Sequence, residues 1–193
     1  MTENTCDVCS MSFDSKESLI DHAKLHMKNV KTVTNSGRAL ISAVIGGIVG
    51  GVLMLLVLMG GASGMGLSST TFALVMGMGL GASMGSAVMI GVLGHFIVSI
   101  VAGAIFGAIV SYVKPFRMKS GPRSIGLGVA FAIVLYLVFF LPMAMTVFAS
   151  VMMNLMGNKA AMMLPNVLLI GLIGHILYGF ALGATAFYVG KKL

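Results

Sequence analysis

The chain divides into a polar N-terminal segment and a long apolar remainder. Residues 1–37 contain most of the polar positions, whereas residues 39–113 contain no Asp, Glu, Lys or Arg. A second apolar region follows from about residue 124 to residue 190. A helix that crosses a bilayer needs about 20 consecutive apolar residues, and both regions exceed that length. The pattern therefore predicts several membrane-spanning helices.

We expect four crossings. They run from Arg38 to about Met59, from about Ala87 to Val113, from about Ser124 to Leu141, and from about Asn166 to Gly190. Glycines at 60–64 and Pro142 mark the ends of the first and third crossings. Residues 70–85 are apolar but rich in glycine, and we expect them to re-enter or to lie at the outer surface. The predicted fold is an all-α polytopic membrane protein.

Basic residues at the ends of the apolar runs predict the orientation. Arg38 precedes the first run, a central cluster lies at 114–123, and Lys191 and Lys192 follow the last run. Lys and Arg are retained preferentially on the cytoplasmic side. Four crossings place all three groups on that side, so both termini are expected in the cytoplasm of a multi-pass cell-membrane protein. A fifth crossing by 70–85 would move the central cluster outside.

Two segments of the apolar region repeat. Residues 90–104, IGVLGHFIVSIVAGA, align without gaps to residues 170–184, IGLIGHILYGFALGA. The transmembrane domain, 38–193, thus comprises two pseudo-repeated halves, about 38–113 and 124–190. Because both halves start on the cytoplasmic side, they are expected to be related by a pseudo-twofold axis along the membrane normal.

Composition agrees with this organisation. The chain has 193 residues, of which 58% are hydrophobic and only 9% are charged, whereas about a quarter of the residues of a soluble domain are charged. The formal net charge of +7 comes from bases that flank the apolar runs. We interpret these bases as orientation signals and as contacts to anionic membrane lipid.

The polar N-terminal segment contains a candidate metal site. Cys6 and Cys9 are separated by two residues, and His22 and His26 by three, with twelve residues between the pairs. This is the ligand spacing of a Cys2His2 zinc site, and histidines four positions apart share one helix face. With Phe13 and Leu19 in register, residues 4–28 resemble the C2H2 zinc-finger family.

The resemblance implies a small ββα unit. Cys6 and Cys9 would lie on a β-hairpin and the two histidines on a helix over about 15–27, with Phe13 and Leu19 as the miniature core. Zn²⁺ would be a structural cofactor that supplies the folding free energy of so short a segment, on the order of 10 kcal/mol. The predicted domains are a finger at 1–28, a polar linker at 29–37 and the transmembrane domain. Reduced thiols as ligands agree with a cytoplasmic finger.

The finger helix does not suit DNA. Its base-facing positions are Ser15, Glu17, Ser18 and Asp21. The five carboxylates of the chain all lie in this segment, at Glu3, Asp7, Asp14, Glu17 and Asp21. Negative charge repels phosphate, and a single finger buries little surface on a duplex. We therefore predict protein partners rather than nucleic acid.

His95 and His175 are the candidate intramembrane site. They occupy equivalent positions of the repeat, and an imidazole inside a bilayer is costly unless it has a partner. Both halves also place methionines toward the outer side, and thioethers with imidazoles are ligands that suit Cu(I). The alternative is that each histidine fixes helix packing through a hydrogen bond, and that methionine fills space.

No enzymatic constellation is present in the sequence. No carboxylate follows Asp21, and the chain has neither a phosphate-binding loop nor a nucleophile beside a base. We expect a non-enzymatic accessory or scaffold subunit of a larger membrane complex, with the finger as its docking module. The alternative is a small transporter or copper-handling protein that uses His95, His175 and the outer methionines, or an auxiliary subunit of a copper-dependent membrane enzyme. A membrane-tethered regulator with the finger on nucleic acid is a third hypothesis.

Overall fold

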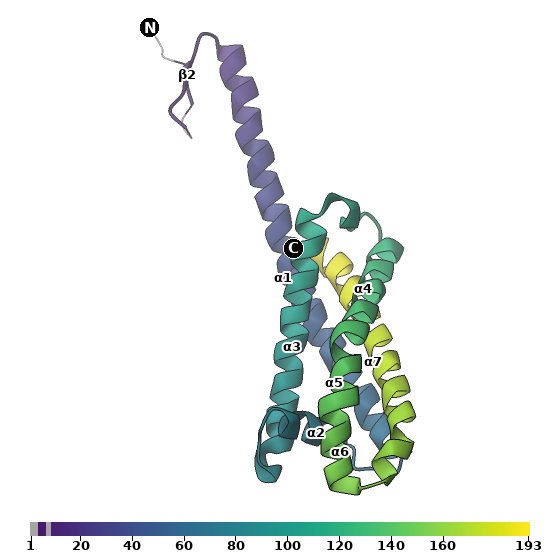
Figure 1. The fold of residues 1–193 in the computed structure, drawn as a ribbon. Coiled ribbons are helices and arrows are strands. Elements are labelled where there is room, and N and C mark those ends of the chain that lie inside the picture. The colour runs from purple at the N-terminus through teal and green to yellow at the C-terminus, as the bar shows by residue number, and fades with distance from the viewer. Residues whose placement is uncertain (1–3, 7–8) are drawn as a thin grey trace.

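The computed structural model describes residues 4–6 and 9–193, and for residues 27–36 it describes the backbone alone. The chain begins with a two-stranded antiparallel hairpin, β1 (Asn4–Thr5) and β2 (Ser12–Phe13), in which Asn4 pairs with Phe13. Helix α1 (Lys16–Gly64) follows. The hairpin lies beside the start of this helix (Figure 1), which is the expected ββα order.

Helix α1 continues from the finger into the first apolar segment without a break over 49 residues. The expected polar linker, 29–37, is therefore helical. It contains no proline, so nothing in it interrupts the backbone hydrogen bonds. The helix also continues past the expected end at Met59, and all the glycines at 60–64 lie inside it. The finger consequently stands away from the bundle on a helical arm (Figure 1).

Within the described residues, four helical segments are long and apolar enough to cross a membrane. Their bounds are Gly37–Gly64, Met84–Tyr112, Gly121–Met156 and Lys159–Gly190. The helix α2 (Thr71–Gly79) has nine residues, too few to span, as expected for 70–85. It packs against α3 (Met84–Tyr112) at the end of the bundle opposite the finger (Figure 1), after a turn in which Gly81 has φ +88°.

The third apolar segment differs from the prediction. After the 3-10 turn η1 (Lys114–Phe116), it runs as α4 (Gly121–Leu135), η2 (Tyr136–Phe140), α5 (Leu141–Met143), η3 (Ala144–Phe148) and α6 (Ala149–Met156). The prediction of an end at Pro142 was wrong. Proline clashes with the carbonyl four residues before it, and the two flanking π-helical turns widen the backbone around it.

Helix α7 (Lys159–Gly190) starts seven residues before the expected Asn166 and contains Pro165 near its beginning. The Met-rich stretch at 143–163 thus forms the ends of two helices, and Gly157, with φ +60°, supplies the tight turn between them. Its left-handed backbone is a conformation that glycine adopts at no steric cost.

Close glycine contacts hold the helices in antiparallel pairs. A Cβ added to Gly47 of α1 would lie 3.1 Å from Cα of Gly103 in α3. In the second half, a Cβ on Gly128 of α4 would lie 3.0 Å from Cα of Gly183 in α7, the residue that aligns with Gly103. Backbones this near leave no room for larger residues. The glycines therefore allow the helices of each pair to pack closely inside the bundle.

The two halves do not pack symmetrically on each other. Helix α1 lies along α7, where Gly46 contacts Leu182 and Gly50 contacts Tyr178. The corresponding pair, α3 and α4, does not pack along its length in this way, although the rings of Phe106 and Phe131 lie 5.5 Å apart. The arrangement of the halves thus departs from the expected twofold relation.

Candidate metal centre

A tight turn in the hairpin presents the two cysteines. The backbone N–H of Cys6 donates to the carbonyl of Met11 at 2.8 Å, and that of Ser10 donates to the carbonyl of Cys6, also at 2.8 Å. Ser10 has φ +59°, in the left-handed region, which turns the chain sharply after Cys9. Cys6 is buried. The turn brings both cysteine side chains toward the helix.

The start of α1 presents the two histidines. Ser15 caps the helix by accepting a hydrogen bond from the backbone N–H of Ser18 at 3.2 Å. His22 and His26 follow one turn apart, with ring centroids separated by 4.6 Å. The Phe13 ring lies 4.7 Å from that of His22, and Phe13 and Leu19 are both half-buried. Phe13, one of the two expected core residues, is therefore beside the ligands.

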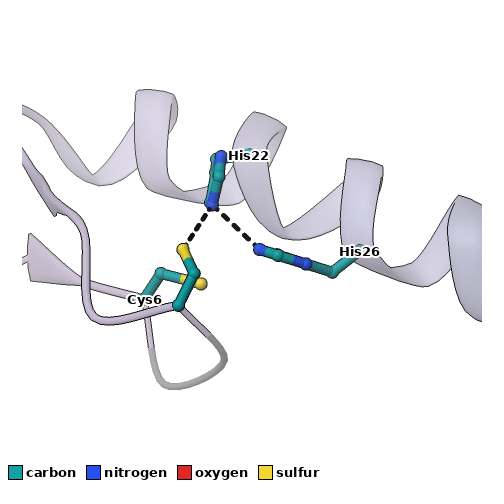
Figure 2. A group of neighbouring side chains, drawn as sticks. Cys6, His22 and His26 are labelled. Atoms are coloured by element: carbon teal, nitrogen blue, oxygen red, sulfur yellow. Dashed lines mark hydrogen bonds between the residues drawn. The ribbon is translucent and has the colours of Figure 1, made fainter.

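The four predicted ligands converge. One ligand atom each of Cys6, Cys9, His22 and His26 lies within 4.8 Å of the others. Nε2 of His22 is 3.0 Å from Sγ of Cys9 and 2.9 Å from Nε2 of His26 (Figure 2). One ring nitrogen carries at most one proton, so it cannot donate to both neighbours at once. Converging lone pairs of this kind suit a cation, and the group can hold a metal ion.

The donor set fits a tetrahedral ion. Zinc–sulfur and zinc–nitrogen bonds of about 2.3 and 2.0 Å place tetrahedral ligand atoms about 3.3 to 3.8 Å apart, a spacing within that of this cluster. Two thiolates and two imidazoles form the closed ligand set of structural zinc sites. Across the described residues, 4–6 and 9–193, this is the one cluster of three or more His, Cys, Asp or Glu ligands.

His95 and His175 do not join such a cluster. His95 is buried on α3, and its Nε2 lies 2.9 Å from the carbonyl oxygen of Gly51 on α1. His175 is buried on α7, and its Nδ1 lies 2.8 Å from the carbonyl oxygen of Gly171 in the same helix. Each ring is thus hydrogen-bonded to a backbone carbonyl. One contact joins two helices and the other stays within one helix.

The surroundings of the two histidines also differ. The ring of His175 lies 5.4 Å from that of Tyr136 and 5.1 Å from that of Phe140, and these two aromatic rings stack on each other. The ring of His95 has one such neighbour, Phe96, at 5.7 Å. Repeated sequence positions therefore occupy unlike sites, because η2 presents two aromatic rings to His175, whereas α1 presents the carbonyl of Gly51 to His95.

A further polar residue of the interior, Tyr178, was not predicted from the sequence. Tyr178 is buried on α7, and its hydroxyl donates to the carbonyl of Ser99 on α3 at 2.9 Å. The hydroxyl of Ser99 in turn donates to the carbonyl of His95 at 2.8 Å. The available signal was a tyrosine three residues after the repeated histidine, at a position where the first half has Val98.

The outer methionines divide between core and surface. Met152 is buried, and Met156 and Met163 pack partly against the core, whereas Met84 and Met162 are 60% and 73% exposed. This distribution resembles that of space-filling apolar side chains more than a converging set of thioether ligands.

Comparison of the chain with family models, with characterised proteins and with solved structures finds no match.

Proposed function

We propose that the protein is an accessory or scaffold subunit of a larger membrane complex, with a zinc-loaded finger on the cytoplasmic side as its docking module. The observation that carries this proposal is the convergence of the four ligands, two of them on a helix that continues into the first apolar segment. A partner bound to the finger would be held at a set distance from the membrane by the same helix that anchors the protein.

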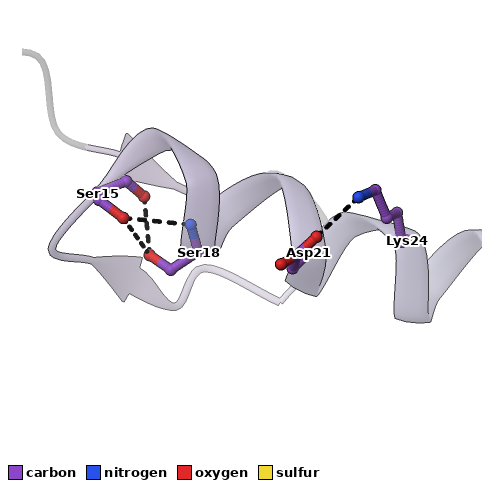
Figure 3. A network of polar contacts seen from close by, with 4 residues as sticks. All are labelled: Ser15, Ser18, Asp21 and Lys24. Carbon is purple, nitrogen blue, oxygen red and sulfur yellow. Dashed lines mark hydrogen bonds and ion pairs between the residues drawn. The ribbon is translucent and has the colours of Figure 1, made fainter.

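The polar surface of the finger favours a protein partner over nucleic acid. Ser15 and Ser18 hydrogen-bond to each other, and Asp21 forms an ion pair with Lys24 at 2.7 Å (Figure 3). These include base-facing positions of a DNA-reading finger, and their polar groups are engaged within the helix itself. The exposed carboxylate of Glu17 adds negative charge, which opposes an approach to phosphate.

Apolar side chains on the finger supply a contact surface for a protein. Met11, Ile20 and Leu25 are 53%, 47% and 58% exposed. Large apolar side chains in the centre of an interface, surrounded by polar residues, are typical of protein–protein contacts.

In the bundle, the glycine pairs lie between its own helices. Lateral contacts to a partner would therefore come from aliphatic faces such as Leu93 and Ile97 on α3, which are 53% and 62% exposed.

The test compares two single substitutions in the full chain, purified from its source membrane in mild detergent. His22→Ala removes a ligand, and a finger without its metal loses on the order of 10 kcal/mol of folding free energy. We expect this variant to remain in the membrane fraction but to lose its zinc and its stoichiometric partner. Lys24→Ala removes only a surface ion pair, worth about 1 kcal/mol or less, and is expected to keep both.

If the unsubstituted protein and both variants all purify without a partner, that result contradicts the accessory role. Metal analysis of the same samples addresses the copper-handling alternative. The decisive result would be a copper content of the unsubstituted protein that exceeds its zinc content, together with loss of this copper in the His95→Ala, His175→Ala double variant. That result would favour soft-metal handling by the bundle over the accessory role. Unchanged metal content with a lower melting temperature would assign those histidines to helix packing.

A further inference from the structure

A cavity of about 280 Å³ opens at the end of the bundle from which the finger arm emerges. Its charged lining comes from three separate segments: Arg38 of α1, Lys119 of the connection before α4, and Lys191 just after α7. Ala39, Met118 and Phe187 contribute an apolar part of the lining. Three positive side chains thus surround one concave site that is also partly apolar.

These positive charges have no carboxylate side chain near them in the sequence. Every Asp and Glu of the chain precedes residue 22. The one ion pair within the described part of the chain joins Lys24 to Asp21, in the finger. Nζ of Lys191 lies 4.5 Å from the ring centroid of Phe187, a cation–π contact that leaves its charge unneutralised. Like charges brought to one cavity repel each other unless an anion lies between them.

A nearby basic residue shows the contrast. Arg123, four residues after Lys119, directs its guanidinium away to the carbonyl of Pro115, to which it donates at 2.6 Å. Arg123 therefore has a role in fixing the connection before α4. Lys114 and Arg117 belong to the same connection and do not line the cavity. Some of the basic residues at this end of the bundle therefore line the cavity, and others do not.

We propose that this cavity binds the phosphate of an anionic phospholipid headgroup from the cytoplasmic leaflet. The proposal rests on the proposed membrane insertion with this end cytoplasmic. Arg and Lys bind phosphate oxygens through charge-assisted hydrogen bonds, and each basic side chain near a membrane surface strengthens binding of anionic lipid about fivefold.

The surroundings of the cavity favour a lipid over free phosphate. Its lining lies at the ends of helices long enough to span a membrane, where headgroups are found. Leu40 and Ile41, directly after two lining residues, are 40% and 54% exposed and offer an aliphatic surface to acyl chains. Apolar neighbours would contribute nothing to the binding of free phosphate. The bound lipid would fasten the start of the apolar part of α1, at Arg38, to the end of α7.

The experiment is native mass spectrometry of the full-length protein in detergent, with equal concentrations of phosphatidylglycerol and phosphatidylcholine. We expect one retained phosphatidylglycerol per chain. The triple variant R38Q/K119Q/K191Q is expected to lose it, and each single substitution to weaken it about fivefold. The matched control, K114Q/R117Q/K192Q, removes the same charge from the same end and is expected to retain the lipid. The single variant Lys119→Gln, at an exposed position, covers the case in which the triple variant does not fold.

Three outcomes would overturn the proposal. Equal losses in both triple variants would indicate general attraction by the basic end without a site. Displacement of phosphatidylglycerol by equimolar inorganic phosphate would indicate a site for soluble phosphate. Equal retention of phosphatidylcholine would indicate that charge does not matter. Alkaline extraction of membranes distinguishes these three outcomes from failure of the proposed function. A protein that is released by the extraction would not be an integral membrane subunit.

Discussion

Polar side chains inside the bundle are used to join helices. His95 contacts the carbonyl of Gly51, Ser99 donates to the carbonyl of His95, and Tyr178 donates to the carbonyl of Ser99. Among the described residues, no buried side-chain nitrogen or oxygen lacks a hydrogen-bond partner. A polar group without a partner costs several kcal/mol in hydrocarbon, so such contacts are required wherever a polar residue is buried. They favour a packing role for His95.

Tyr178→Phe is the substitution that tests this interior contact. It keeps the ring and removes the hydroxyl that joins α7 to α3. Hydrogen bonds between membrane helices contribute about 0.6 kcal/mol on average and up to about 1.7. We expect the variant to unfold at a lower denaturant concentration by an amount in that range. Tyr112→Phe, at a side chain that is 77% exposed, is the control and should change nothing. Equal stability of both variants would contradict an interhelical bond at Tyr178.

Helix α4 offers a matched pair of glycines. A Cβ on Gly128 would meet the backbone carbonyl of Gly179 in α7, whereas a Cβ on Gly126 would meet nothing within 4 Å. We expect Gly128→Ala to force the two helices apart and to destabilise the protein by about 1 to 3 kcal/mol. Gly126→Ala should stabilise it slightly, by up to about 1 kcal/mol, because alanine restricts the unfolded chain. Thermal unfolding in detergent measures both, and a Gly128→Ala protein as stable as wild type would exclude a close α4–α7 contact.

Local sequence signals predicted which helices exist better than where they end. The metal ligands and four apolar helices follow from spacing and run length, which depend on residues close in the chain. Pro142 predicts a helix end because proline removes a helical hydrogen bond, but π-helical turns on both sides accommodate it. The unlike surroundings of His95 and His175 depend on Tyr136 and Phe140 of a distant segment. Local spacing carries no information about such tertiary neighbours.

Charge divides the whole molecule into two regions. All the carboxylates lie in the finger segment, and the residues from Arg38 onward carry only basic charged side chains. Most of these bases lie at the end of the bundle that continues into the finger arm, where α1 enters, α3 connects to α4, and α7 ends (Figure 1). At the opposite end, between α6 and α7, Lys159 is the basic residue of the turn. This distribution is the one that retains a helix end on the cytoplasmic side.

The orientation can therefore be tested with two introduced cysteines. Ser120, before α4, is at the basic end, and Asn158, before α7, is at the opposite end; both are exposed. In intact cells, a membrane-impermeant maleimide should label Asn158→Cys, and should label Ser120→Cys only after permeabilisation. The unsubstituted chain controls for Cys6 and Cys9. Because Lys and Arg cross a membrane reluctantly, the reverse pattern would mean that the basic end is outside. It would place the finger outside the cytoplasm as well, since α1 joins the finger to that end, and the proposed cytoplasmic docking role would fail with it.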